Sequence, residues 1–173
     1  MTDENDNLIL GALEVCDLPE LQISDLHVRV DTGAKTSSLH VDNIEAKRVK
    51  GIKQVSFDIH PDIHNVSRVV RRSSKVKEVR LIKSSNAAKE KRYVIETLIS
   101  MGGRTWPIEV TLTDRSGMSY LMLLGRQAMM HGVLVDPSRE YLLNAELTSV
   151  SDTKPDTESD IEADTESEIE TDS

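Results

Sequence analysis

A strand that delivers one carboxylate into a turn is predicted at Val28-Arg29-Val30-Asp31-Thr32-Gly33-Ala34-Lys35-Thr36-Ser37-Ser38-Leu39. Val28 and Val30 alternate with Arg29, which is the pattern of a half-buried strand. Small and hydroxyl residues around one glycine then end the strand, so Asp31 is presented rather than buried. Asp-Thr-Gly alone also fits a simple turn, in which the aspartate accepts a backbone hydrogen bond and the glycine supplies positive φ. The tripeptide alone does not distinguish a simple turn from a catalytic loop, so a second sequence feature is needed.

The second element is an apolar strand far downstream, Leu121-Met122-Leu123-Leu124, which runs into Gly125-Arg126 and a short helix-like segment. Glycine at that point allows two backbones to approach closely. An early Asp-Thr-Gly-Ala and a late apolar strand ending in Gly-Arg resemble the retropepsin-like aspartic protease fold. The resemblance implies that this strand passes beside the Asp-Thr-Gly loop, with Leu124, Gly125 and Arg126 as its structural support.

Further motifs follow in chain order: Leu18-Pro19, Val30 to Ser37, His60-Pro61, Ser84-Ser85-Asn86, Arg92-Tyr93-Val94-Ile95, Trp106-Pro107-Ile108, Leu123 to Arg126 and Val135-Asp136-Pro137. Over roughly residues 11–143 the chain resembles the family commonly named putative ATP-dependent zinc proteases. That family is placed structurally among retropepsins. It is associated with an ATP-grasp ligase that adds glutamates to a ribosomal protein, so the resemblance implies a functional link to such a ligase.

The retropepsin resemblance implies chemistry by two carboxylates that share a proton, one taking a proton from water while the other donates to the carbonyl oxygen. The chain offers one Asp-Thr-Gly, because Asp114-Arg115-Ser116-Gly117 has an extra residue. We therefore expect a symmetric homodimer in which two copies of Asp31 meet. Thr32 would brace the loop, Gly33 would let the substrate backbone pass close, and Ala34 would line the adjacent wall.

Lys35 departs from the retroviral pattern, in which an acidic residue commonly follows Asp-Thr-Gly-Ala and often pairs with the arginine after the late glycine. The partner of Arg126 is therefore open. If Lys35 lies close to Asp31, its charge would lower the pKa of that carboxyl, hold both carboxylates ionised and weaken acid-protease chemistry.

Acidic residues gather at the end of the chain. Ten of the 30 acidic residues lie between residues 147 and 173, against Lys154 alone among the 21 basic ones, so the net charge of -9 belongs to that segment. Two isoleucines among ten acids cannot offset the entropy of ordering it. We expect a disordered N-terminus at 1–7, a peptidase domain at 8–146, and an acidic disordered tail at 147–173 that either solubilises the protein or is attracted to its basic residues.

The stretch from Arg68 to Arg92 holds ten basic residues and two acids. It is either a solvated hairpin or a site for an anionic partner. Few aromatic residues accompany it, which argues against nucleic acid. With the family resemblance, an acidic, glutamate-rich peptide is the expected ligand, bound through Arg71, Arg72, Lys75 and Lys77 as well as Lys35. Which loop forms a flap over the site stays open, and Lys77 to Arg92 is a candidate only by its position between the two motifs.

Cofactor and metal signals are weak, and we expect neither. No phosphate-binding glycine loop, His-Glu-x-x-His or paired Cys-x-x-Cys is present. A metal site gathered in space from His40, His60 or Asp62 stays open as an alternative. Ser37 and Ser38 lack the surroundings of a nucleophile and are expected to bond the loop backbone.

Targeting signals are lacking as well. Cys16 is the single cysteine, which fits a reducing compartment. The N-terminus is acidic and no apolar run approaches a membrane span. We expect a cytoplasmic protein with no membrane partner.

Alternating short strands and turns indicate an all-β fold, a small closed barrel with one short helix at residues 126–131. The expected strands are 9–15, 26–30, 41–46, 51–59, 66–70, 76–83, 92–101, 105–112, 133–135 and 141–143, besides the apolar strand before Gly125.

Three functions remain open at this point. The first is a dimeric aspartic-type endopeptidase that uses Asp31. The second is a zinc-dependent peptidase, as the family name states. The third is a non-catalytic module that binds acidic peptides through Arg71, Arg72, Lys75 and Lys77.

Overall fold

The computed structural model describes residues 1–60, 68–83, 89–114 and 120–144. Several sequence features lie outside these residues, among them the acidic tail, Asp62, His64 and the Ser84-Ser85-Asn86 motif. Among the described residues, no helix is long and apolar enough to cross a membrane.

The described residues are mostly β-structure, as the sequence predicts, with one short α-helix and one turn of 3₁₀ helix. The elements are β1 (Leu8–Leu10), β2 (Leu13–Leu18), η1 (Pro19–Leu21), β3 (Ile23–Val30), β4 (Ser37–His40), β5 (Asp42–Val49), β6 (Ile52–Ile59), β7 (Val70–Lys83), β8 (Lys89–Met101), β9 (Arg104–Thr113), β10 (Met122–Leu124), α1 (Arg126–Met129) and β11 (Val133–Val135).

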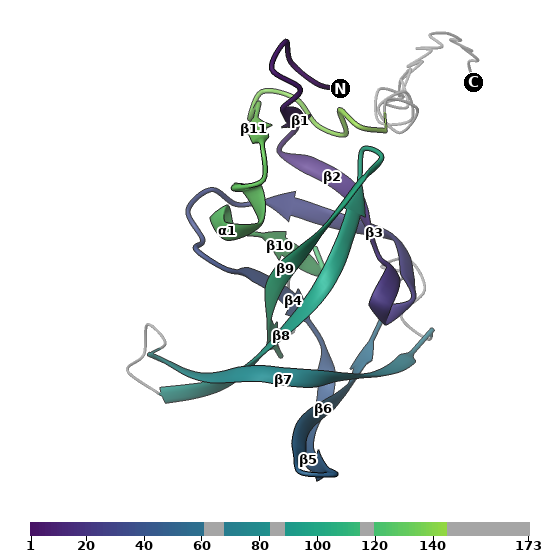
Figure 1. Ribbon diagram of the computed structural model, residues 1–173, viewed down its shortest axis with the longest axis vertical. Helices are drawn as coiled ribbons and strands as arrows, with labels where there is room; N and C mark the ends of the chain where they lie inside the picture. The colour runs from purple at the N-terminus through teal and green to yellow at the C-terminus, as the bar shows by residue number, and fades with distance from the viewer. Residues whose placement is uncertain (61–67, 84–88, 115–119, 145–173) are drawn as a thin grey trace, which may run out of the picture.

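Six strands close into a barrel in the order β2-β3-β10-β4-β9-β8. A pairing of Asp17 with Ser100 joins β2 to β8 and completes the circuit. Closure removes free strand edges, which would otherwise pair with other chains. The expected small closed barrel is therefore confirmed (Figure 1).

Beyond β8 the sheet continues through β7, β6 and β5, which we call the arm. In Figure 1 the long strand β7 crosses below the barrel and β5 forms the far end of the arm. The pairing of Val76 with Ile95 begins a long antiparallel ladder between β7 and β8, so the arm is continuous with the barrel wall.

The core lies inside the barrel and extends to the base of the arm. Val28, Leu39, Met122 and Leu124 are fully buried where three barrel strands meet, and Phe57 is fully buried on β6. Their alternate spacing along each strand is what directs them to one face. The barrel and the inner part of the arm therefore share one apolar cluster.

The first expected strand, 9–15, is two strands separated at Gly11 and Ala12. A Cβ on Gly11 would lie 2.6 Å from the carbonyl oxygen of Arg139, so a later segment passes against the chain there. The expected strand 141–143 is a turn instead, with Tyr141 at a φ of 53°. Both differences arise because residues 136–143, here called the strap, cross β2 rather than pairing as a strand.

The strap is tied to the start of the barrel by backbone hydrogen bonds. Asp136 N–H donates to Leu10 at 2.8 Å, and Tyr141 N–H donates to Leu13 at 2.7 Å. At its first turn, the Ser138 hydroxyl and the Arg139 guanidinium hold the pKa of Asp136 at about 2, so this carboxylate stays ionised. Residues 1–7 also form a turn, in which Asp3 accepts from Asn7; the disorder expected for them stays a prediction.

Glu14 is a fully buried carboxylate that joins β2 to the strap. Its Oε1 accepts from the N–H groups of Gly11 at 2.7 Å and Leu142 at 3.0 Å, and its Oε2 accepts from Leu143 at 3.3 Å. A buried carboxylate is tolerated when its oxygens are hydrogen-bonded in this way. The acidic residue therefore holds the end of the domain in place.

We expect Glu14→Gln to lower the free energy of unfolding by about 2 kcal/mol, because one acceptor oxygen becomes a donor facing a buried N–H. Urea unfolding followed by circular dichroism measures the effect. The exposed Glu140→Gln is the matched control and should change stability by less than about 0.5 kcal/mol. Equal effects of the two substitutions would contradict this role for Glu14.

The middle of the barrel contains a crossing of segments that are distant in sequence. β10 lies between β3 and β4, parallel to the first and antiparallel to the second. A Cβ on Gly125, directly after β10, would lie 2.5 Å from the carbonyl carbon of Thr36 and 2.8 Å from the nitrogen of Ser37. These are backbone atoms that cannot swing aside, so the crossing requires glycine.

We expect Gly125→Ala to lower the free energy of unfolding by about 3 kcal/mol, because the added methyl forces two backbones apart. Gly103→Ala is the comparison: nothing lies within 4 Å of a Cβ there, and only the φ of +76° opposes it, at roughly 1 kcal/mol. Thermal and urea unfolding of both variants would test this ranking. A Gly125→Ala protein as stable as Gly103→Ala would show that the crossing relaxes easily.

Candidate active site

Asp31 stands at the end of β3, where the crossing fixes its backbone. Its N–H donates to the carbonyl of Leu124 at 2.9 Å. Its Oδ1 accepts from the N–H groups of Gly33 at 2.9 Å and Ala34 at 3.2 Å. Within the described residues, Oδ2 accepts no hydrogen bond. The side chain is half-buried, so the loop presents one oriented carboxylate with one oxygen available for chemistry.

The segment after Gly125 holds the loop from the other side. Arg126 N–H donates to Ala34 at 2.9 Å, and Gln127 N–H donates to Lys35 at 3.0 Å. The Arg126 guanidinium also donates from Nη1 to the carbonyls of Thr32 at 2.8 Å and Gly33 at 2.9 Å. Among the described residues, the partner that the sequence left open for Arg126 is thus the loop backbone rather than an acid.

Ser37 hydrogen-bonds the segments on both sides of β4 and has a structural role. It is fully buried, and its hydroxyl oxygen accepts from Gly125 N–H at 3.1 Å, while its carbonyl accepts from the Thr111 hydroxyl at 3.1 Å. Sequence reasoning expected Ser37 and Ser38 to bond a loop, but they begin β4, which pairs with both β10 and β9. Neither pattern nor propensity marks this short strand.

A polar network that sequence reasoning missed joins the loop to the arm. The Arg80 guanidinium on β7 donates to the Thr36 hydroxyl at 2.9 Å and pairs with Glu109 at 2.9 Å. The Thr36 hydroxyl in turn donates to the side chain of Gln127 at 2.8 Å. Three elements, β7, β9 and α1, therefore meet at the end of the Asp31 loop. Their partners lie far apart in sequence, so no local signal could have found them.

Lys77 belongs to the same network rather than to an open cationic surface. Its ammonium lies 2.8 Å from Glu109 and 2.6 Å from Glu96. These carboxylates, Glu109 first, raise its pKa well above the usual range, and Lys77 and Arg80 lower the pKa of Glu109. Both groups therefore stay charged and paired at neutral pH.

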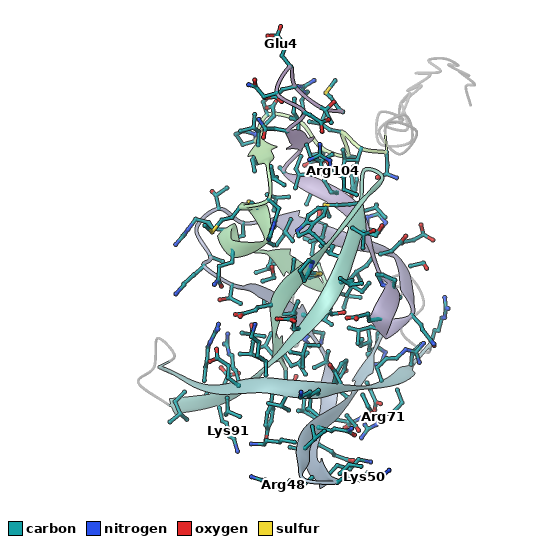
Figure 2. The ribbon with its side chains drawn as sticks, in the orientation of Figure 1. Glu4, Arg48, Lys50, Arg71, Lys91 and Arg104 are labelled. Carbon is teal, nitrogen blue, oxygen red and sulfur yellow. The ribbon has the colours of Figure 1, made fainter. Side chains whose placement is uncertain are left out.

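Arg71 and Arg72 lie away from the Asp31 loop within one subunit. Arg71 pairs with Glu45 at 2.8 Å and Asp58 at 3.0 Å, on the arm (Figure 2). Arg72 donates to the carbonyls of Leu21 and Gln22, at the beginning of β3. Asp31 follows the other end of that strand, about 25 Å away at the rise of an extended chain.

Lys35 and Arg126 differ from the paired cations of β7 and β8. The Lys35 side chain is exposed, directly after the Asp-Thr-Gly-Ala run. Within the described part of the chain, neither residue pairs with a carboxylate, whereas Arg71, Lys77, Arg80 and Arg92 all do. Lys75 on β7 is exposed and also has no carboxylate partner among the described residues; only its backbone is paired, with Gln54. Uncompensated positive charge therefore lies beside Asp31.

The Asp31 loop does not have the donor set of a zinc site. Among the described residues, the one cluster with metal-ligand spacing is His40, Asp42 and Asp114, which does not include Asp31. Backbone N–H groups occupy one oxygen of Asp31 instead. The loop geometry fits acid–base chemistry by a carboxylate, and among the described residues no group of three potential metal ligands includes Asp31.

Comparison with known proteins agrees with this geometry. The family model described as retropepsin-like aspartic endopeptidase RimB matches residues 9–146. A solved structure from Legionella pneumophila, described as a protein of unknown function (DUF785), has a TM-score of 0.68 and 29% sequence identity. It covers 79% of this chain and 98% of its own.

Two curated relatives carry another name. Proteins named probable alpha-L-glutamate ligase from Shewanella pealeana and Shewanella halifaxensis are 45% and 44% identical to this chain, over 139 and 142 residues. The matches cover 80% and 82% of this chain but 30% and 31% of those proteins. The family model covers most of the chain, and its name matches the loop geometry. The chain therefore belongs to the RimB-like family of retropepsin-like aspartic endopeptidases.

Proposed function

We propose that the chain is an aspartic-type peptidase that acts as a homodimer, with Asp31 of each subunit at the twofold axis. The observation that carries the proposal is the Asp31 carboxylate itself, which is held at Oδ1 by Gly33 and Ala34 and has no hydrogen-bond donor at Oδ2 among the described residues. One chain supplies one such carboxylate. A symmetric pair is the arrangement that supplies two from one sequence.

In the dimer, two like charges held close cannot both ionise readily, so the pair shares one proton. The ionised Asp31 takes a proton from water while the protonated Asp31 donates to the carbonyl oxygen, which forms a tetrahedral intermediate. Collapse of that intermediate breaks the C–N bond, and the leaving nitrogen receives a proton from the pair. Thr32 and Gly33 lie in the exposed part of the loop, where a partner subunit and a substrate backbone can reach them.

Apolar exposure supports a second copy near the loop. Met130 is 81% exposed and Leu134 is 47% exposed, in the segment that follows Arg126. Exposed large hydrophobic side chains are ones that a protein contact can bury. Arg126 and Gln127, a few residues before Met130, hydrogen-bond the Asp31 loop, so a second copy that covers Met130 would lie close to this loop.

The proposed substrate is an acidic, glutamate-rich peptide. Relatives named probable alpha-L-glutamate ligase contain a region like this chain within a polypeptide about three times longer. A hydrolase joined to a ligase of glutamate would act on the class of bond that the ligase makes. Lys35 and Arg126, which have no carboxylate partner among the described residues, supply positive charge beside Asp31 that would attract substrate carboxylates.

We expect Asp31→Asn to abolish cleavage of a glutamate-tailed peptide, with a loss of at least about 10³-fold, because the pair loses its proton acceptor. Mass spectrometry of the peptide measures cleavage, and sedimentation measures the dimer, which should persist. Chelator should leave wild-type cleavage unchanged.

Each alternative has its own signature in that experiment. Chelator-sensitive cleavage that survives Asp31→Asn would overturn the aspartic mechanism and favour a zinc-dependent peptidase. Peptide binding of equal affinity in both proteins, with no cleavage in either, would indicate a non-catalytic module.

Lys35 tests the substrate class separately. We expect Lys35→Gln to lower kcat/KM about tenfold for a glutamate-rich peptide and to leave a neutral peptide nearly unaffected, because one charge contact is lost. Lys47→Gln, on the exposed face of β5, removes the same charge far from the loop and should change neither value. Identical kinetics of the two variants would remove Lys35 from substrate recognition and leave the peptidase proposal standing.

A further inference from the structure

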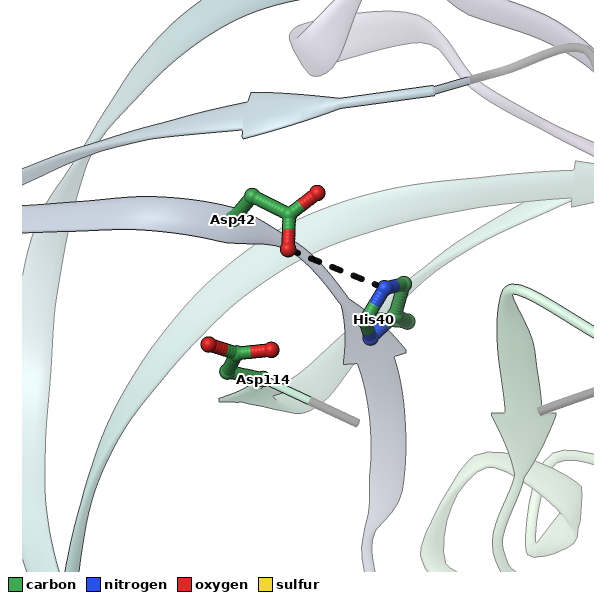
Figure 3. Close-up of side chains that lie close together, drawn as sticks. All are labelled: His40, Asp42 and Asp114. Carbon is green, nitrogen blue, oxygen red and sulfur yellow. Dashed lines mark ion pairs between the residues drawn. The ribbon is translucent and has the colours of Figure 1, made fainter. Parts of the chain in front are cut away.

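His40, Asp42 and Asp114 meet where β4 ends, β5 begins and β9 ends, as Figure 3 shows. One possible ligand atom from each lies within 4.8 Å of the others. The pairing of β4 with β9 brings them together, because His40 is the partner of Thr113 in the ladder and Asp114 follows it. We call these three residues the corner cluster.

The spacing is close to what a bound ion requires. His40 Nε2 and Asp42 Oδ1 are 3.9 Å apart, which is too long for a hydrogen bond. Two ligand atoms at 2.0–2.2 Å from a tetrahedral ion lie about 3.4 Å apart. The 3.9 Å contact would have to shorten by about 0.5 Å, and a pair at the 4.8 Å limit by about 1.4 Å, for the three side chains to coordinate one ion.

The two carboxylates of the corner cluster differ in their described partners from other acids of the arm and barrel. Glu45, Asp58, Glu96 and Glu109 in the arm and barrel each pair with a lysine or arginine. Within the described residues, Asp42 and Asp114 have no lysine or arginine partner. Two carboxylates held near each other repel, and a cation between them would relieve that repulsion.

A fourth residue orients the Asp42 carboxylate. His60 Nε2 lies 2.9 Å from Asp42 Oδ2, the oxygen that faces away from the contact with His40. This contact directs Oδ1 toward the other two members. Hydrogen bonds to the outer oxygen of a ligating carboxylate are the usual support around metal ligands.

We propose that the corner cluster binds one divalent transition-metal ion, with His40, Asp42 and Asp114 as ligands and His60 as their support. One imidazole nitrogen with two carboxylates suits Zn²⁺ or Mn²⁺ better than Ca²⁺, which prefers an all-oxygen shell. The ion joins the base of the arm to the end of β9 and stabilises the fold.

The corner cluster is separate from the proposed chemistry. His40 lies three residues along β4 from Ser37, about 10 Å at the rise of a strand, and Asp31 lies beyond Ser37. The metal proposal therefore stands or falls independently of the peptidase proposal.

The test uses the full chain after treatment with chelator and removal of the chelator. Titration calorimetry with Zn²⁺ and with Mn²⁺ should give one ion per chain. At free ion one hundred times the Kd, thermal unfolding should shift upward by roughly 5–10 °C. His40→Asn and Asp114→Asn should each lose both the binding and the shift. His60→Gln should weaken binding by about 10–100-fold without abolishing it.

Two controls make the outcome specific. His131→Asn removes an exposed histidine elsewhere, and Asp31→Asn removes the proposed catalytic carboxylate; both should bind as wild type does. Circular dichroism without metal confirms that each variant folds. The proposal is overturned if wild type binds no ion, or if His40→Asn and Asp114→Asn bind as tightly as wild type, which would place the ions on other acidic residues.

Discussion

The close approach of Gly125 to Thr36 and Ser37 is the contact on which the rest of the structure depends. With less than 3 Å available for a Cβ, the two backbones meet directly. That contact lets β10 lie between β3 and β4, so Leu124 can accept from Asp31 N–H while Ser37 accepts from Gly125 N–H. The position of the Asp31 carboxylate thus follows from a missing side chain on another segment, rather than from its own tripeptide.

Ion pairs in the fold change the interpretation of the basic stretch at residues 68–92. Residues 68–92 look like a surface for anions when read alone. In the fold, Glu45 from β5 and Glu109 from β9 neutralise Arg71 and Lys77. What remains near Asp31 is the positive charge of Lys35 and Arg126. Recognition of an acidic substrate would therefore rest on the loop itself more than on the arm.

Local sequence signals succeeded where the fold needs a particular residue type at a particular place. Asp31 to Gly33 and Gly125-Arg126 are such places, and the barrel followed from them together with strand alternation. β4 was missed because Ser37 and Ser38 have the composition of a turn, and the pairing that makes them a strand comes from β9 and β10. Glu14 and the strap were missed for the same reason: a lone acid on a strand gives no sign that later N–H groups will reach it.

The corner cluster is a further case in which topology, not sequence, brings residues together. His40 and Asp42 flank Val41, whose N–H donates to the carbonyl of Thr113 at 3.1 Å, and this bond holds Asp114 beside them. β4 therefore has the Asp31 loop at one end and the corner cluster at the other. β4 is paired on both sides and is only four residues long. An ion at the corner would therefore stabilise the whole of this strand. The hydrogen bonds that orient Asp31 come from the loop and from β10. Such an ion would therefore leave the orientation of the Asp31 carboxylate unchanged.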